Sequence, residues 1–205
     1  PDESTPPDTT PPTTAGPSAA ADPVEGDPAV IAITTARAAR MRVWVESDLA
    51  DDYLAGDTRF RAALESLAQA AQQPGVTGVK FADNLAYSGF TSSRDVETFL
   101  QRAAGALRQA VPGKRLAIGV VVPELGCGAA RTCITAMRAK APLATKQLVE
   151  RYLKAAAVEQ VYVSTGLFAA AYRQHQVSDQ KTEEPQPITP ALATRAQWLS
   201  IKALG

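Results

Sequence analysis

The chain has 205 residues, and its 21 basic residues are balanced by 21 acidic ones without any basic run. This length is enough for one sizeable domain with a buried core. The even charge gives no reason to expect a nucleic acid or an anionic membrane surface as a partner. No apolar stretch approaches the roughly 20 residues that a membrane-spanning helix needs, so we expect no transmembrane segment.

Residues 1–26 are rich in proline and threonine, with Ser, Ala, Asp and Glu between them. Such a segment buries too little apolar surface to offset the entropy cost of ordering, so it is predicted to be disordered. Pro/Thr-rich tethers commonly follow a removed signal sequence or a lipid-anchored cysteine in exported bacterial proteins. We therefore predict a secreted or envelope-associated, lipoprotein-like protein, with an intracellular linker as the alternative. Residues 27–205 are expected to form one α/β domain.

Within residues 27–205, strand and helix patterns alternate four times. The helix predicted at 28–40 has a strand as its alternative, because several of its residues are β-branched. The polar segment 178–190 is predicted to be an exposed loop. The expected strands cover 42–46, 76–82, 116–122 and 160–165, and the expected helices cover 28–40, 57–73, 93–111, 143–157, 168–175 and 190–204.

The strand–helix repeat is about 35–40 residues long, which argues for parallel strands joined by right-handed crossovers. Two architectures fit this alternation. The favoured one is TIM-barrel-like, with four βα units that form half of a (β/α)₈ barrel or a truncated one, because the chain stops where a fifth strand would be due. The alternative is a four-stranded doubly wound sheet. No glycine-rich fingerprint follows the first strand, so we expect no dinucleotide and no other cofactor.

In parallel α/β folds the ligand site lies at the C-terminal ends of the strands. Alternate residues of a strand face opposite sides, so the apolar ones should meet the helices and the others should line the opposite face. This parity turns Asp83 outward and leaves Glu124 unplaced, since its strand is apolar on both faces. The implied lining consists of Trp44, Glu46, Lys80, Asn84, Tyr162 and Ser164, with Asp48 at the rim.

Glu46 and Lys80 can touch if their strands are neighbours, because adjacent strands lie about 4.8 Å apart. One interpretation is an ion pair that only ties two strands together, since burying either charge alone is costly. The other is a functional pair, in which Lys80 controls the pKa of the carboxylate or serves as a base or anion anchor.

Carboxylates at successive strand ends, with aromatic rings nearby, are typical of carbohydrate-active enzymes. Glycosidic cleavage needs two carboxyl groups about 5–5.5 Å apart for retention, or about 6.5–9.5 Å for inversion. Aspartates at strand ends also serve as helix caps, which is the structural alternative. The candidate catalytic residues are Glu46, Lys80, Asp83 and Glu124, and the candidate ligand-binding residues are Trp44, Asp48, Asn84, Tyr162 and Ser164.

Cys127 and Cys133 enclose five residues and are predicted to form a disulfide, which would agree with an oxidising compartment. A metal site is the competing interpretation. It would need more ligands than two cysteines, and the single histidine, His175, lies far along the chain, so we expect no metal.

Four segments together resemble secreted or lipid-anchored (β/α)-barrel proteins of the glycoside hydrolase-like kind: 1–23, 42–48, 80–87 and 122–127. The resemblance implies an exported protein that acts on carbohydrate. Barrel glycosidases of the familiar pattern carry an acid at the end of strand four, and 163–166 has none. A non-catalytic carbohydrate or small-ligand module, or a purely structural domain, therefore remains as an alternative.

Overall fold

The computed structural model describes residues 28–164, 168–178 and 185–202. The predicted tether at 1–26 lies outside these residues. The helices are α1 (Pro28–Ala38), α2 (Leu49–Leu54), α3 (Asp57–Gln72), α4 (Ser93–Ala110), α5 (Arg131–Lys140), α6 (Lys146–Ala156), α7 (Ala169–Tyr172), α8 (Pro190–Lys202) and the 3₁₀ turn η1 (Pro123–Cys127). The strands are β1 (Val43–Glu46), β2 (Val76–Lys80), β3 (Arg115–Val121), β4 (Gln160–Ser164), β5 (Gln176–Ser178) and β6 (Pro185–Pro187).

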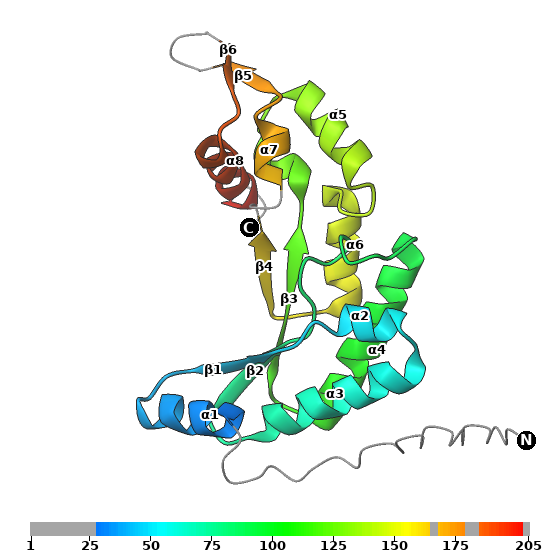
Figure 1. The fold of residues 1–205 in the computed structure, drawn as a ribbon, viewed down its shortest axis with the longest axis vertical. Helices are drawn as coiled ribbons and strands as arrows, with labels where there is room; N and C mark the ends of the chain where they lie inside the picture. The colour runs from blue at the N-terminus through cyan, green and yellow to red at the C-terminus, as the bar shows by residue number, and fades with distance from the viewer. Residues whose placement is uncertain (1–27, 165–167, 179–184, 203–205) are drawn as a thin grey trace, which may run out of the picture.

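The centre of the molecule is a four-stranded, all-parallel sheet in the sequential order β1-β2-β3-β4. Helix α4 lies between α3 and α6 and packs against both, so these three helices form a layer along the sheet (Figure 1). Right-handed crossovers that always advance in one direction place their helices on the same face. The α/β prediction is confirmed. The strand order lacks the reversal that defines a doubly wound sheet, and no closed barrel is seen in the described residues.

The apolar side chains of the strands meet the helix layer, as side-chain parity predicts. Val79 is fully buried, and Val45, Val161 and Val163 pack against the same core. Strand β3 is buried from Leu116 onward, in agreement with its continuous apolar sequence. The alternate side chains of each strand point to the opposite face of the sheet. We call this face, which is turned away from the helix layer, the inner face.

Most of the predicted elements are confirmed, including the helix at the start of the domain. The side chain of Ser92 caps α4 by accepting the N–H of Asp95. Helix α3 has Gly56 at its cap position, with φ 119°, and Asp57 is its first helical residue. Only glycine adopts such a φ readily. The sequence patterns did not predict α2, α5 or the antiparallel β5–β6 hairpin.

A second group of elements lies beyond the C-terminal ends of β3 and β4 (Figure 1). Turn η1 packs against both α5 and α8. The sulfur atoms of Cys127 and Cys133 lie 1.95 Å apart, so the predicted disulfide joins η1 to α5. In the described part of the chain, no helix is long and apolar enough to cross a membrane.

Two buried tyrosines provide a test of the core. The hydroxyl of Tyr152 on α6 is buried without a hydrogen-bond partner among the described residues, whereas the hydroxyl of Tyr172 donates to the carbonyl oxygen of Pro123 at 2.6 Å. We expect Tyr152→Phe to raise the free energy of unfolding by about 1 kcal/mol, because it removes an unpaired buried polar group. Urea denaturation measures the change. The matched variant Tyr172→Phe should lower the free energy by about as much, and equal effects of the two changes would contradict the assignment.

Candidate functional site

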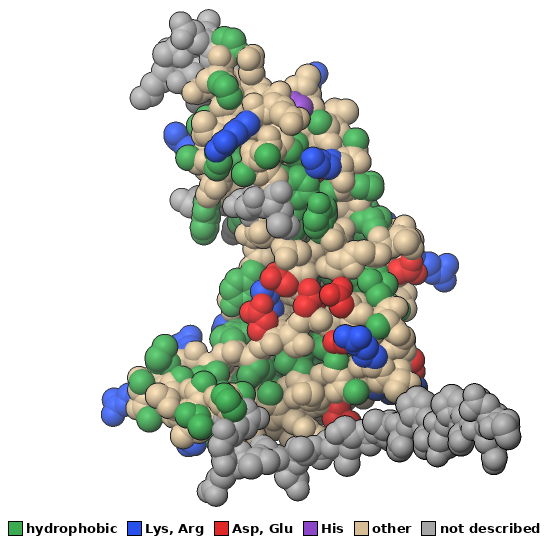
Figure 2. All heavy atoms as spheres, in the orientation of Figure 1, with side chains coloured by type: hydrophobic (Ala, Val, Ile, Leu, Met, Phe, Trp, Pro, Cys, Tyr) green, Lys and Arg blue, Asp and Glu red, His purple; other side chains and the backbone are tan. Residues whose placement is uncertain are grey.

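Lys80 joins carboxylates from two neighbouring strand ends. Its Nζ lies 2.8 Å from Oε1 of Glu46 and 3.3 Å from Oδ1 of Asp83. Glu46 is opposite Lys80 in the parallel register of β1 and β2, so strand pairing sets the first of these contacts. The predicted Glu46–Lys80 contact is thus present. Acidic side chains gather around a basic one at the middle of the face that Figure 2 shows, between the lower part that contains β1 and the upper part that contains α8.

In the Glu46–Lys80 ion pair, the carboxylate is exposed to solvent and the lysine side chain is largely buried. The Lys80 side chain is 12% exposed, whereas that of Glu46 is 58% exposed. Burial lowers the pKa of Lys80, but hydrogen bonds from its ammonium group to Glu46 and Asp83 outweigh this effect, and the pKa lies above its ordinary value of 10.5. Lys80 is therefore positively charged at neutral pH and does not serve as a general base.

The parity prediction for Asp83 is wrong, and the structure places this carboxylate on the inner face. The N–H of Gly119 donates to Ala82, and the carbonyl oxygen of Gly119 accepts from Leu85. In a regular parallel ladder these two partners are two positions apart, and here they are three apart. The ladder is also shifted just before Asp83: the N–H of Phe81 donates to Ala117, so in a regular ladder the N–H of Gly119 would donate to Phe81 and not to Ala82. An extra residue of this kind, as in a β-bulge, reverses the alternation of side chains at Asp83.

Gly119 makes room for the reoriented carboxylate. A Cβ atom at this position would lie 2.0 Å from Oδ1 of Asp83, so any other residue here would displace the Asp83 carboxylate from this position. The same oxygen accepts the backbone N–H of Asn84 at 2.9 Å. A glycine inside an otherwise apolar strand often marks a close backbone approach, so Gly119 was the one signal in the sequence that pointed to this arrangement.

Asp48 lies near Asp83 and has a different environment. Its Oδ1 accepts the N–H of Ala50 at 3.2 Å, and it thereby caps α2. Burial raises the pKa of Asp48, and the negative charges of Asp51 and Asp83 act in the same direction, while hydrogen bonds from the N–H groups of Ala50 and Asp83 partly offset them. Asp48 therefore keeps a proton to higher pH than an ordinary aspartate.

Aromatic and amide side chains extend the inner face across β3 and β4. Tyr162 is 42% exposed, and the Nζ of Lys80 lies 5.5 Å from the centre of its ring. The hydroxyl of Tyr162 accepts a hydrogen bond of 2.8 Å from Gln160. The side chain of Arg115 donates to Oε1 of Gln160 at 3.0 Å. Arg115 and Gln160 were not predicted as site residues, because single polar residues at the start of a strand carry no distinctive pattern.

Trp44 is less accessible to a ligand than the sequence analysis implied. The guanidinium of Arg115 lies 5.3 Å from the centre of its ring. The ring also packs so closely over Gly78 that a Cβ atom there would lie 2.5 Å from it. Trp44 thus helps to pack the inner face, and Tyr162 offers the more open ring.

Three other candidate residues take different places. Glu124 is buried in η1, where its carboxylate accepts from Nε of Arg138 at 2.6 Å and from the backbone N–H of Lys146. It therefore ties η1 to α5 and α6. Asn84 contributes its backbone, in a left-handed conformation with φ 44°. Ser164 ends β4 opposite Val121.

The described residues contain no group of three or more His, Cys, Asp and Glu side chains that could hold a metal ion. Comparisons of the chain with family models, with curated proteins and with solved structures found no match. The functional conclusion therefore rests on the side chains around Lys80.

Replacing Lys80 tests whether it holds the carboxylates together. We expect Lys80→Met to lower the free energy of unfolding by about 1 kcal/mol at neutral pH, because it leaves the charges of Glu46 and Asp83 facing each other. Denaturant melts measure the loss, which should shrink in strong acid as carboxylates become protonated. The control Lys154→Met changes an exposed lysine of α6. If Lys80→Met is as stable as the parent, the free-energy cost of burying the Lys80 charge equals the stabilisation from its contacts with Glu46 and Asp83.

The raised pKa of Asp48 predicts a pH-dependent stability. The folded protein holds this proton more tightly than the unfolded chain, whose aspartate has an ordinary pKa near 3.8. The parent should therefore lose stability relative to Asp48→Asn as the pH rises from below 3.8 through the raised pKa, and the difference should then stay constant. Asparagine keeps an oxygen acceptor for Ala50. Denaturant melts between about pH 3 and pH 7 measure the difference, and a difference independent of pH would contradict the raised pKa of Asp48.

Proposed function

We propose that this chain is a glycoside hydrolase-like protein that acts on carbohydrate through the carboxylates around Lys80. The observation that carries the proposal is the convergence of Glu46 and Asp83 on one Nζ atom. Since these oxygens lie 2.8 and 3.3 Å from that atom, they are no more than about 6 Å apart. Two carboxylates this close to each other can act on the same sugar ring, one as the nucleophile and the other as the group that stabilises its positive charge.

The roles follow from charge and exposure. Glu46 has a more exposed carboxylate than Asp83 and can reach a sugar carbon as the nucleophile, with Asp83 beside it to stabilise positive charge on the sugar ring. Asp48, whose pKa burial raises, is the proton donor for the leaving oxygen. Lys80 holds Glu46 and Asp83 next to each other, and Tyr162 supplies a ring on which a sugar can stack.

The proposal extends to the architecture and the location of the protein. The sequential strand order, the helix layer and the polar inner face support four βα units of a TIM-barrel-like fold. The Cys127–Cys133 disulfide supports export to an oxidising compartment, either secreted or attached to the cell envelope.

A non-catalytic carbohydrate-binding module is the second candidate, and one observation favours it. The charged Lys80 already holds both Glu46 and Asp83, which lowers the availability of their oxygens for attack. Exposed carboxylates next to an open tyrosine ring can also bind sugar hydroxyl groups without cleaving a bond.

Hydrolysis of a panel of 4-nitrophenyl glycosides and polysaccharides tests the enzyme. We expect turnover by the parent and a loss of about 100-fold or more in Glu46→Gln and in Asp83→Asn, which retain the shape but not the charge. The control Glu150→Gln removes an exposed carboxylate of α6 and should leave the rate unchanged.

Glycan binding, measured by calorimetry on the same proteins, separates the two candidates. Binding without turnover, weakened by Tyr162→Ala, would favour the binding module. If the parent shows no turnover and no glycan binding, the proposed role in carbohydrate chemistry is overturned.

A further inference from the structure

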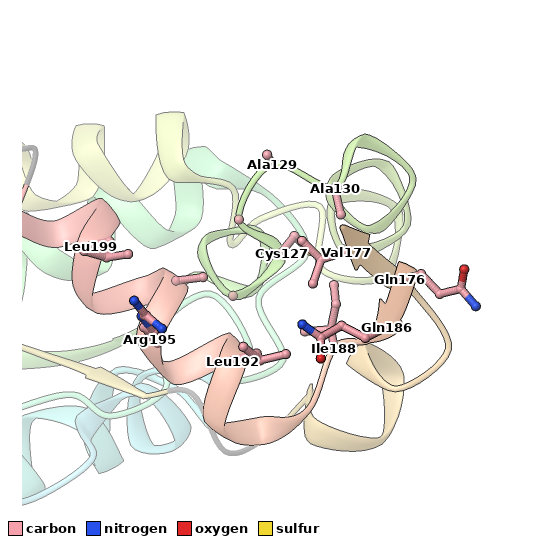
Figure 3. A pocket seen from close by; sticks show the side chains of 13 residues that line it. Cys127, Ala129, Ala130, Gln176, Val177, Gln186, Ile188, Leu192, Arg195 and Leu199 are labelled. Atoms are coloured by element: carbon pink, nitrogen blue, oxygen red, sulfur yellow. The ribbon is translucent and has the colours of Figure 1, made fainter. Parts of the chain in front are cut away.

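A pocket of about 570 Å³ lies in the upper part of the molecule. Its lining includes none of Glu46, Lys80 and Asp83. We call it the Arg195 pocket. Its walls come from the cysteine-bearing turn after β3, from the β5–β6 hairpin and from α8 (Figure 3). Its volume falls within the range of about 300–1,000 Å³ that small-molecule sites occupy. The lining includes Cys127, Val177, Gln186, Ile188, Leu192 and Arg195.

The walls of the Arg195 pocket are mainly apolar. The side chains of Val177, Ile188 and Leu192 converge on the space beside Cys127, whereas Gln176 points away from it (Figure 3). Small residues on the opposite side, among them Ala130, leave this space unfilled. The disulfide holds the wall that carries Cys127 against α5. Such walls suit a ligand with an apolar body.

Arg195 is the single charged residue in the lining, which contains no carboxylate. It extends from α8 at one end of the pocket (Figure 3). Within the described residues its guanidinium takes part in neither a hydrogen bond nor an ion pair, and the side chain is exposed. A guanidinium binds a carboxylate through two parallel hydrogen bonds.

We propose that the Arg195 pocket binds a small apolar carboxylate, with the alkyl or aryl body between Val177, Ile188 and Leu192 and the carboxylate on Arg195. The ligand class follows from the combination of apolar walls with one cation that lacks a partner among the described residues. The site does not use Glu46, Lys80 or Asp83, so it is independent of the proposed carbohydrate chemistry.

Calorimetric titration of the full chain with decanoate tests the pocket, with decanamide as the uncharged probe of equal length. We expect saturable binding of decanoate and binding of decanamide that is at least about tenfold weaker, because the amide lacks the charge that Arg195 recognises. Arg195→Gln should weaken decanoate binding by a similar factor. Arg173→Gln changes an exposed arginine outside the lining and should leave it unchanged.

The outcomes are separable from those at the carbohydrate site. Glu46→Gln should bind decanoate as the parent does. Equal affinities for decanoate and decanamide, or equal affinities of the parent and Arg195→Gln, would overturn the assignment of Arg195. If the parent does not bind decanoate, the assignment of the pocket as an anion site is overturned. Circular dichroism melts confirm that each variant is folded.

Discussion

The positive charge of Lys80 is the constraint around which the lower part of the structure is arranged. It lies on a central strand, and its side chain is almost covered, so the charge has to be compensated from close by. Parallel pairing brings Glu46 opposite it, and the extra residue opposite Gly119 turns Asp83 towards it. The ion contacts, the bulge and the glycine therefore depend on one another. The carboxyl groups of Glu46 and Asp83 become neighbours in this way without losing their access to solvent.

The sheet separates scaffold from chemistry by its two faces. Valines on one face and the helices α3, α4 and α6 form the core that fixes the strand register. The other face carries Trp44, Tyr162 and their polar neighbours, joined by cation–π contacts and amide hydrogen bonds. A shift of register by one residue would exchange these faces. The apolar core consequently determines which side chains meet at the carboxylates.

The upper part of the molecule is organised by different contacts. Glu124 ties η1 to α5 and α6, and the disulfide fixes the same turn, so two strong links meet next to the end of β3. The Arg195 pocket is built on this turn, together with α8 and the hairpin. Glu124, a candidate catalytic residue from the sequence, thus helps to hold one wall of the Arg195 pocket.

The sequence by itself determined the alternation of strands and helices, the faces of β1 and β4, and the candidates Glu46 and Lys80, because these follow from local periodicity and from charge placed in an apolar strand. The tertiary structure alone decided the strand order, the inward position of Asp83, the partial cover on Trp44 and the role of Glu124. Each of these depends on residues distant in the chain: Gly119 admits Asp83, Arg115 covers Trp44, and Arg138 binds Glu124. The α5 helix and the β5–β6 hairpin were missed for the same reason, since their sequences lack a clear period and long-range packing selects their conformation.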